Sequence, residues 1–421
     1  MTYLETVEYL YNSAPLFQNI GAGAYKEGLS NTEALDKHFK HPHKKYKTIH
    51  IAGTNGKGSV SHTIAAILQC AGYKVGLYTS PHLIDFRERI RVNGKMIPEE
   101  RVITFVEEEK AFFEPLHPSF FELTTALAFK YFEEENVDIA VIETGLGGRL
   151  DCTNIIDPIM SVITNISFDH VQFLGSTLTA IAHEKAGIIK QNTPVVIGES
   201  SSNPDIRNVF ATKAKDTNSP IVFADELPRK TIETQLKGYC QEKNTQTIHT
   251  AIEVLRKIQD KESSSLVLNI SDEAIEEGFL HVCELTGLMG RWQIISKQPL
   301  TICDTGHNTA GWMYLSKQLD ATPGILHIVV GMVGDKDVRK VISLLPKRAK
   351  FYFTQAKVKR AMRVEEFASI AKDCGLNGSI HHTVMQAYQT AKNNASIEDT
   401  IFVGGSTFVV ADFLEAVAFS V

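Results

Sequence analysis

The sequence predicts an α/β protein of two domains. The N-terminal domain is expected to hold a phosphate-binding loop (P-loop) on a parallel sheet, and the smaller C-terminal domain to be doubly wound and Rossmann-like. Three observations predict this fold: short β-branched runs alternate with helical patterns along most of the 421 residues, a glycine-rich loop follows the first such run, and a second set of runs follows a glycine-rich boundary. Such alternation is typical of a parallel sheet covered by helices.

The first set of elements begins with a strand at Lys47–Ala52 and a helix at Ser59–Ala71, whose apolar residues recur at helical spacing. Gly72 follows this helix, at a position where a left-handed residue commonly ends one. Further apolar runs predict the remaining strands of this domain, which are Lys74–Thr79, Asp138–Ile142, Ile159–Thr164 and Pro194–Ile197.

The segment TGLMGRW, Thr286–Trp292, is the expected boundary between the domains, which we place at 1–288 and 289–421. Beyond it, about 130 residues are enough for a separate doubly wound domain. Its expected strands are Leu300–Cys303, Ile325–Val330, Phe351–Thr354 and Thr400–Val403.

Composition excludes several classes of partner. The formal net charge is −6 without a long basic run, so nucleic acid is not expected. Acidic residues at Glu5 and Glu8 and the lack of an apolar core argue against a secretory signal, and no apolar run approaches the ~20 residues of a membrane span. The 6 cysteines show no CxxC pairing and are expected to be reduced core residues. These features predict a cytoplasmic protein that does not bind membranes.

The stretch IHIAGTNGKGSVSHTIAAIL, Ile49–Leu68, departs from the usual P-loop spacing of Gly, four residues, then Gly-Lys-Ser/Thr. It still combines a strand, a glycine-rich loop and a helix start, which favours phosphate binding over a merely tight turn. Lys57 adds a positive charge, and Ser59 can hold Mg²⁺. The predicted nucleotide-binding residues are Gly53, Thr54, Asn55, Gly56, Lys57, Gly58 and Ser59.

Three further side chains are candidates for chemistry at the same sheet. Glu143 ends the apolar run VDIAVIE and predicts a carboxylate at the carboxyl end of the sheet, with an exposed strand-end carboxylate as the alternative. His170 follows a strand and can ligate a second metal, or can be an ordinary loop histidine. Lys185 lies in an expected helix beside Glu184, where a surface ion pair is the alternative. The spacing of these residues alone does not decide between the alternatives.

Several motifs in one order carry a family resemblance that spans nearly the whole chain. The motifs are GTNGKGS, TSPHL (Thr79–Leu83), ERIRVNG (Glu88–Gly94), ETGLGGRLDCTN, DHVQFLGSTL (Asp169–Leu178), HEKAGI (His183–Ile188), GR at Gly290–Arg291, DTGHN (Asp304–Asn308) and DKD (Asp335–Asp337). Together they resemble the folylpolyglutamate synthase/dihydrofolate synthase branch of the Mur ligase family.

This resemblance implies that the unusual loop is the short GTxGK form of the family. It also implies an ATP-dependent ligase, in which the γ-phosphate converts a carboxylate into an acyl phosphate that the amine of L-glutamate attacks. The leading prediction is a monomeric enzyme that adds glutamate to folates and also to dihydropteroate, with ATP and Mg²⁺ as cofactors.

The resemblance also implies roles for individual residues. Lys57 and Ser59 would handle the β- and γ-phosphates, and Asn244 would lie on the adenine side. Ser59, Ser80, Glu143, His170 and Lys185 would form the metal sites, with Lys185 carbamylated. From the C-terminal domain, Arg291 would reach the phosphates and Asp304 the ribose, while His307 and Ser406 would lie near the incoming glutamate.

Two segments depart from the family pattern. DTGHN has Thr305-Gly306 where the family commonly shows Gly-Ala or Val-Ala, and we expect this change to affect only packing. The segment AGAYKEGLSNTEAL, Ala22–Leu35, resembles only loosely the segment with which dihydropteroate-accepting members grip the pterin.

Two rival functions are weighed against the leading one. A cell-wall Mur ligase would carry a domain for a UDP-linked substrate before its loop, and too little chain precedes Gly53 for that. A P-loop nucleotide switch of the GTPase type would show an N/T-K-x-D segment, and none lies in a plausible place.

Overall fold

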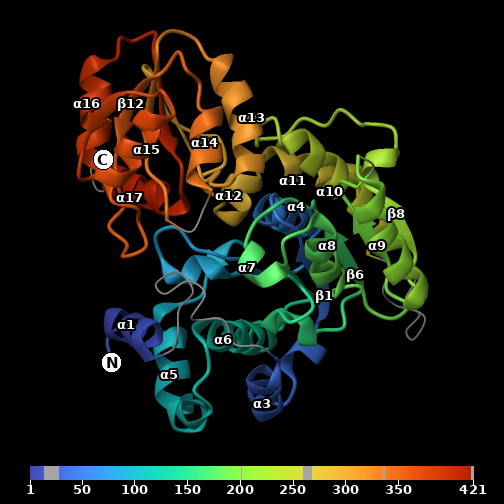
Figure 1. Ribbon diagram of the computed structural model, residues 1–421. Coiled ribbons are helices and arrows are strands. Elements are labelled where there is room, and N and C mark those ends of the chain that lie inside the picture. Colours follow the sequence, from blue (N-terminus) through green and yellow to red (C-terminus); the bar gives the residue numbers. More distant parts are fainter. Residues whose placement is uncertain (14–27, 201, 259–267, 335–336, 419–421) are drawn as a thin grey trace. The chain divides into compact units, whose positions relative to one another are not determined.

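The computed structural model describes residues 1–13, 28–200, 202–258, 268–334 and 337–418 (Figure 1). Residues 22–27 of the expected pterin segment and residues 335–336 of the DKD motif lie outside the described residues. The chain divides into two compact units. The first unit comprises Met1–His82, Phe86–Gln235 and Gln241–Leu288, and the second comprises Leu83–Asp85, Leu236–Cys240 and Met289–Val421.

The first unit is built on one sheet, with eight strands in its described part in the order β4-β3-β2-β5-β1-β6-β7-β8. The strands from β2 to β8 in this order run parallel, and β3 alone runs in the opposite direction, pairing antiparallel with both β2 and β4. The carboxyl ends of β2, β5, β1 and β6 therefore meet at one edge. The strands are β1 (Lys47–Ala52), β2 (Val75–Tyr78), β3 (Ile90–Val92), β4 (Lys95–Met96), β5 (Ile139–Glu143), β6 (Met160–Ile163), β7 (Val195–Ile197) and β8 (Ile221–Phe223).

Helices cover both faces of this sheet, as the alternation of strand and helix patterns predicts. Because side chains alternate along a strand, Ile139 and Val141 of β5 join a core with α4, α10 and α11, whereas Ala140 and Ile142 join one with α5 and α6. The helices of this unit are α1 (Tyr3–Ser13), α3 (Ser30–His38), α4 (Lys57–Cys70), α5 (Glu99–Phe113), α6 (Phe120–Glu134), α7 (Val171–Leu174), α8 (Leu178–Ala186), α9 (Pro204–Asp216), α10 (Gln241–Leu255), α11 (Asp272–Leu280) and α12 (Val282–Thr286).

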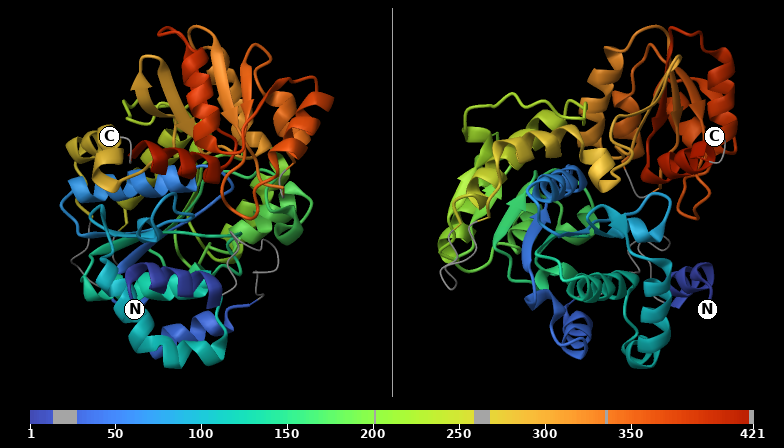
Figure 2. Two further views of the ribbon diagram at one scale, coloured as in Figure 1. Left: turned by 90° about the vertical axis from the view of Figure 1, so that its left-hand side faces the viewer. Right: turned by 180° about the vertical axis from the view of Figure 1, so that it is seen from behind.

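The second unit contains a sheet whose described strands follow the order β13-β12-β11-β14-β10-β9, and Figure 2 shows these strands between helices. Helices α13, α14 and α15 cover one face, and α16 and α17 cover the other. The elements are β9 (Gln293–Lys297), β10 (Leu300–Asp304), α13 (Thr309–Asp320), β11 (Leu326–Val330), α14 (Val338–Leu344), β12 (Lys350–Phe353), α15 (Val364–Asp373), β13 (Gly378–Ile380), α16 (Val384–Asn394), β14 (Thr400–Gly404) and α17 (Thr407–Ala418). The predicted pair of parallel-sheet α/β folds is confirmed.

Some details differ from the sequence-based expectation. Strand β13 is missing from that expectation because all three of its residues are exposed, which leaves no apolar pattern. Of the six cysteines, all within the described ranges, only Cys303 is buried, so the expectation of mostly core positions is wrong; none forms a disulfide. No helix in the described chain combines the length and apolar character that a membrane span requires.

Candidate active site

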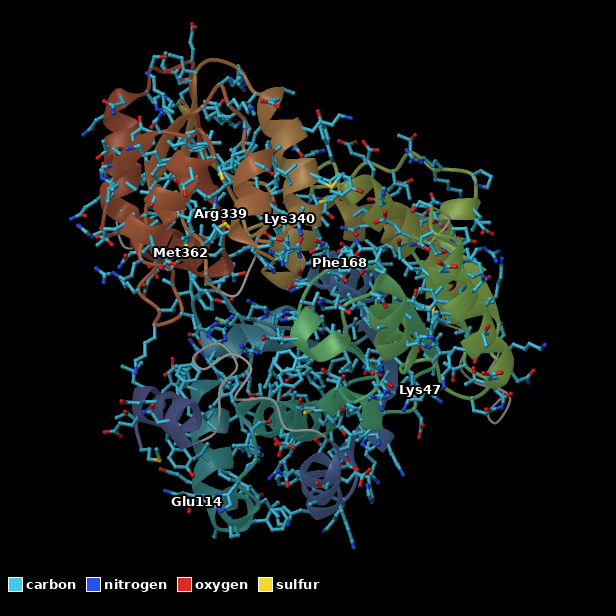
Figure 3. All side chains as sticks on the ribbon, viewed as in Figure 1. Lys47, Glu114, Phe168, Arg339, Lys340 and Met362 are labelled. Atoms are coloured by element: carbon cyan, nitrogen blue, oxygen red, sulfur yellow. The ribbon has the colours of Figure 1, made fainter. Side chains whose placement is uncertain are left out.

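The first candidate site lies at the carboxyl edge of the first sheet. In Figure 3, Lys47 lies at the start of β1, where the strands have their amino ends, and Phe168 lies in the loop after β6, beyond their carboxyl ends. Glu143 is the last residue of β5 and lies on the same face of the sheet as Val141. Glu143 is only 3% exposed, so the alternative of an exposed carboxylate is wrong. The N–H of Ser80, beyond the end of neighbouring β2, donates to Glu143 Oε2 at 3.4 Å.

The loop between β1 and α4 has the tight geometry that a phosphate-binding turn needs. Gly53 and Gly56 both have positive φ angles, 147° and 84°. A Cβ at Gly53 would lie 1.9 Å from Thr164 Oγ1, and one at Gly56 would lie 2.4 Å from Asn244 Oδ1. Only glycine fits these two positions, so the backbone can lie close to β6 and α10. The N–H groups of the first turn of α4 have no intrahelical acceptor and are suited to bind an anion.

Two side chains at the start of α4 are held by nearby groups. Lys57 Nζ donates to the carbonyl of Thr54 at 3.3 Å, and the buried Ser59 hydroxyl accepts from Gln241 Nε2 at 3.2 Å. Gln241 also accepts from Asn244 Nδ2 at 2.8 Å, so the first turn of α10 lies beside the loop. Sequence reasoning missed Gln241, because no recognisable motif links it to a loop 182 residues away.

Lys185 is buried beneath the loop. It is 3% exposed, and its Nζ donates to the carbonyl of Gly53 at 2.7 Å. Burial, assisted by the positive charge of Lys57, lowers the pKa of Lys185 to about 7. Its neighbour Glu184 instead pairs with Arg149 at 2.8 Å, so the alternative of a surface ion pair between Lys185 and Glu184 is wrong.

His170 stands at the same edge, in the loop that leads from β6 into α7. Its backbone is left-handed, with φ 49°, and its N–H donates to Asp169 Oδ1 at 2.9 Å. The side chain is 26% exposed. Among the described residues, no three His, Cys, Asp or Glu side chains gather as a complete set of metal ligands.

The second unit has its own group of polar side chains, at the carboxyl end of β10. Half-buried Asp304 accepts from the N–H groups of Trp292 and Gly306 at 2.7 and 2.8 Å. Burial raises the pKa of Asp304, against the opposing charge of Arg291. Arg291 donates to the hydroxyl of Thr305 and to the carbonyl of Gly290. Thr305 therefore orients Arg291. This corrects the expectation that having Thr305 in place of the residue common in the family affects only packing.

The remaining predicted residues of the second unit lie on the loops after β10 and β14. His307 Nδ1 lies 3.0 Å from the carbonyl of Thr305. Ser406 is 2% exposed, and its hydroxyl accepts from the N–H of Val409 at 3.1 Å, in the first turn of α17. Since Asp304 pairs with Gly404 across neighbouring strands, these loops share one sheet edge.

Two family models match the chain. Residues 51–255 match the Mur ligase middle domain, and residues 290–407 match the Mur ligase glutamate ligase domain. Together they cover the phosphate-binding loop, Glu143, Lys185 and the Asp304 group.

Similar proteins extend this match over nearly the whole chain. The dihydrofolate synthase/folylpolyglutamate synthase of Bacillus subtilis is 36% identical over 76% of this chain and 79% of its own length. The probable bifunctional folylpolyglutamate synthase/dihydropteroate synthase of Haloferax volcanii is 30% identical over 98% of this chain. The chain spans only 50% of that longer relative.

Solved structures of similar proteins share the fold of the full chain. Escherichia coli FolC in complex with DHPP and ADP superposes with a TM-score of 0.85, at 29% identity, over 100% of this chain and 98% of its own. A bifunctional folylpolyglutamate synthase/dihydrofolate synthase with Mn, AMPPNP and L-glutamate bound gives a TM-score of 0.83, at 28% identity, over 99% and 98% of the two chains. The chain thus belongs to the folylpolyglutamate synthase/dihydrofolate synthase branch of the Mur ligase family.

Proposed function

We propose that this protein uses ATP to join L-glutamate to the carboxyl group of a folate, and that it also accepts dihydropteroate. The relatives named for these activities support the proposal, as do the related structures that hold DHPP, ADP, AMPPNP or L-glutamate. A carboxylate is a poor electrophile until one of its oxygens becomes a phosphate leaving group, so we expect an acyl phosphate intermediate. A monomeric enzyme of the cytoplasm is part of the proposal.

In this proposal the N-terminal domain, residues 1–288, binds ATP and the folate. The amide groups of Gly56 and of the first turn of α4 hold the phosphates, and Lys57 adds a positive charge near the transferring group. Asn244, whose side chain lies against Gly56, faces the adenine side.

Magnesium fits the oxygen-rich edge beside the loop. Glu143 supplies a buried carboxylate, Ser80 adjoins it and Ser59 offers a hydroxyl, and Mg²⁺ commonly needs only one or two carboxylates besides phosphates and water. When bound, the cation would neutralise charge on the phosphate oxygens. His170 and a carbamylated Lys185 complete the proposed ligand set.

The observation that carries the proposal is the burial of Lys185 under the loop. A lysine with a pKa of about 7 is largely neutral at physiological pH, so its amine can attack CO₂, lose a proton and become a carbamate. The carbamate retains one N–H, which can keep the bond to the carbonyl of Gly53. Its carboxylate then suits a hard cation beside a triphosphate far better than an ammonium would.

The C-terminal domain, residues 289–421, is proposed to receive the glutamate and the far side of the nucleotide. Arg291 would contact the phosphates and Asp304 the ribose. His307 and Ser406 would contact L-glutamate. Because the Ser406 hydroxyl accepts from Val409, its own proton remains to donate to a carboxylate.

One experiment separates this function from its rivals. The protein is incubated with ATP, Mg²⁺ and L-glutamate against dihydropteroate, tetrahydrofolate and its one-carbon forms, and phosphate release and product mass are measured. We expect phosphate release only when glutamate and an acceptor are both present, with a mass gain of one glutamyl group. Release that needs neither would identify a nucleotide switch or a simple ATPase. Reaction only with another carboxylate acceptor would identify a different Mur-type amide ligase.

A further inference from the structure

The first half of the phosphate-binding loop is held by the segment directly after β6. The Thr164 hydroxyl donates to the carbonyl of Asn55 at 2.6 Å, and the Thr54 hydroxyl donates to the carbonyl of Ser167 at 3.1 Å. The N–H of Ser167 donates back to the Thr54 hydroxyl at 3.1 Å. These bonds connect Thr54 and Asn55 to residues more than 100 positions away.

Asn165 holds two consecutive amide groups of the loop. Its backbone carbonyl accepts from the N–H of Thr54 at 2.9 Å, and its side-chain Oδ1 accepts from the N–H of Asn55 at 3.0 Å. Because both amides are bonded to Asn165, we expect an anion to be bound by the amides of Gly56 and of the first turn of α4 instead. Asn165 would thereby set which part of the loop faces a phosphate.

The amide of Asn165 is itself oriented by an ion pair. Its Nδ2 donates to Glu199 Oε1 at 3.4 Å, and Glu199 pairs with Lys243 on α10. If the amide were flipped, Nδ2 would point at the N–H of Asn55, and two donors would face each other. Lys243 adjoins Asn244, whose side chain lies against Gly56, so the ion pair belongs to the helix that packs on the loop.

We propose that Asn165 is a positioning residue for the nucleotide, and that Glu199 with Lys243 keeps its side-chain amide in the orientation that holds the loop. The inference rests on the proposed function, because it concerns how ATP is held. Asn165 itself touches the loop rather than the phosphates. Its loss is therefore expected to weaken ATP binding more than it weakens binding of the other two substrates.

The test is an exchange of chemical groups between the two positions. Asn165→Asp keeps an oxygen for the N–H of Asn55 but places a carboxylate against Glu199, so we expect KM for ATP to rise roughly tenfold. Glu199→Gln alone should raise KM for ATP only a few-fold. In the double variant the Gln amide can donate to Asp and the net charge equals that of the parent, so most of the ATP affinity should return. KM for the folate and for glutamate should stay near the parent values throughout.

Amide hydrogen exchange at Thr54 and Asn55, without nucleotide, provides a readout that does not depend on catalysis. Exchange there should speed up in Asn165→Asp and slow again in the double variant, even if the proposed ligase function were wrong. Asn218→Asp is the matched control, because Asn218 bonds Asn192 on an exposed surface of the same unit. Near-normal KM for ATP in Asn165→Asp, or no recovery in the double variant, would overturn the inference. So would an equal rise in KM for all three substrates.

Discussion

The two candidate regions occupy the same kind of sheet edge but are held together in opposite ways. In the first unit the bonds that shape the site join distant parts of the chain: Lys185 to Gly53 spans 132 residues, and Gln241 to Ser59 spans 182. Around Asp304 in the second unit they are local: Arg291 to Thr305 spans 14 residues, and Asp304 to Gly306 spans 2. The first site is therefore a product of the folded sheet, whereas the part of the second site between Arg291 and Gly306 is a property of one short segment; only Ser406, on the loop after β14, comes from a distant part of the chain.

This difference predicts where substitutions should have large effects. A long-range bond orders two segments at once, so its loss releases both, whereas a local turn keeps much of its geometry through its own backbone. We expect changes that disturb the first site to lower activity and stability together, and comparable changes in the second to have milder effects.

The largest effect is expected at Lys185. Lys185→Ala removes the proposed carbamate and should lower turnover by about a thousandfold, comparable to the loss of a main electrostatic group of an active site. Lys185→Arg should be equally inactive, because a guanidinium keeps its charge and cannot take up CO₂. Acetate or formate should restore part of the activity of Lys185→Ala in a steady-state assay.

Lys190→Arg is the matched control, because Lys190 also donates to a backbone carbonyl, that of Asn154, in the same unit. It should retain activity. If Lys185→Arg is nearly as active as the parent, the carbamate proposal is wrong, and Lys185 serves only to hold Gly53.

Glu143→Gln is expected to have the next largest effect, about a hundredfold in turnover. The amide oxygen is a weaker ligand for a hard cation than a carboxylate, so the Mg²⁺ concentration for half-maximal rate should rise. A magnesium titration of both proteins measures this shift. An unchanged Mg²⁺ requirement would remove Glu143 from the proposed metal site.

A matched pair of glycine substitutions compares the two regions directly. In Gly53→Ala the new Cβ would meet Thr164 Oγ1 at 1.9 Å, at a positive φ, and Thr164 is held by Asn55. In Gly306→Ala it would meet Leu315 Cδ1 at 2.4 Å, the end of a flexible side chain. We expect Gly53→Ala to lower the free energy of unfolding by about 2 kcal/mol and Gly306→Ala by at most about 1 kcal/mol. Equal losses in denaturant unfolding would contradict the contrast between the regions.

The sequence predicts the fold well because its strongest signals are local. The strands β1, β5, β11 and β14 come from short runs rich in apolar residues and bounded by polar or glycine residues, so their type and order could be read directly. Strand β13 could not be read, since it is exposed along its length and owes its conformation to pairing with β12.

The candidate sites show the same limit. The position of Glu143 at a strand end could be predicted from the preceding apolar run. The contacts of Asn165 and Gln241 with the loop could not, because they depend on which strands and helices become neighbours in space. Thr164 and Asn165 carried one weak signal, a polar pair directly after a buried strand. The roles assigned to all the candidate site residues, from Lys57 to Ser406, remain predictions.

The smallest predicted effect concerns how stability depends on pH, where the two units should differ in sign. Burial lowers the pKa of Lys185 from 10.5 to about 7. Between these values the unfolded chain binds more protons than the folded one, so the free energy of unfolding should rise with pH. The full gain is reached above the unfolded pKa and is lost as pH falls through about 7. Burial raises the pKa of Asp304 above 3.8, so its contribution is present below 3.8 and is lost as pH rises through the folded value.

Substitution of either group should remove that group's contribution to the pH dependence of the free energy of unfolding. In denaturant unfolding without metal or CO₂, the parent should gain up to about 1.4 kcal/mol per pH unit over Lys185→Met within the alkaline window. In Asp304→Asn, the fall of the free energy of unfolding with rising pH should disappear, and this change should be confined to acidic pH. The long-range site then becomes more stable in alkali, where its buried amine is neutral, while the local site becomes more stable in acid, where its carboxyl is neutral. If the free energies of unfolding of Lys185→Met and the parent vary in parallel between pH 7 and 10.5, the amine is not held neutral by burial. The chemical basis for a carbamate at this position is then lost.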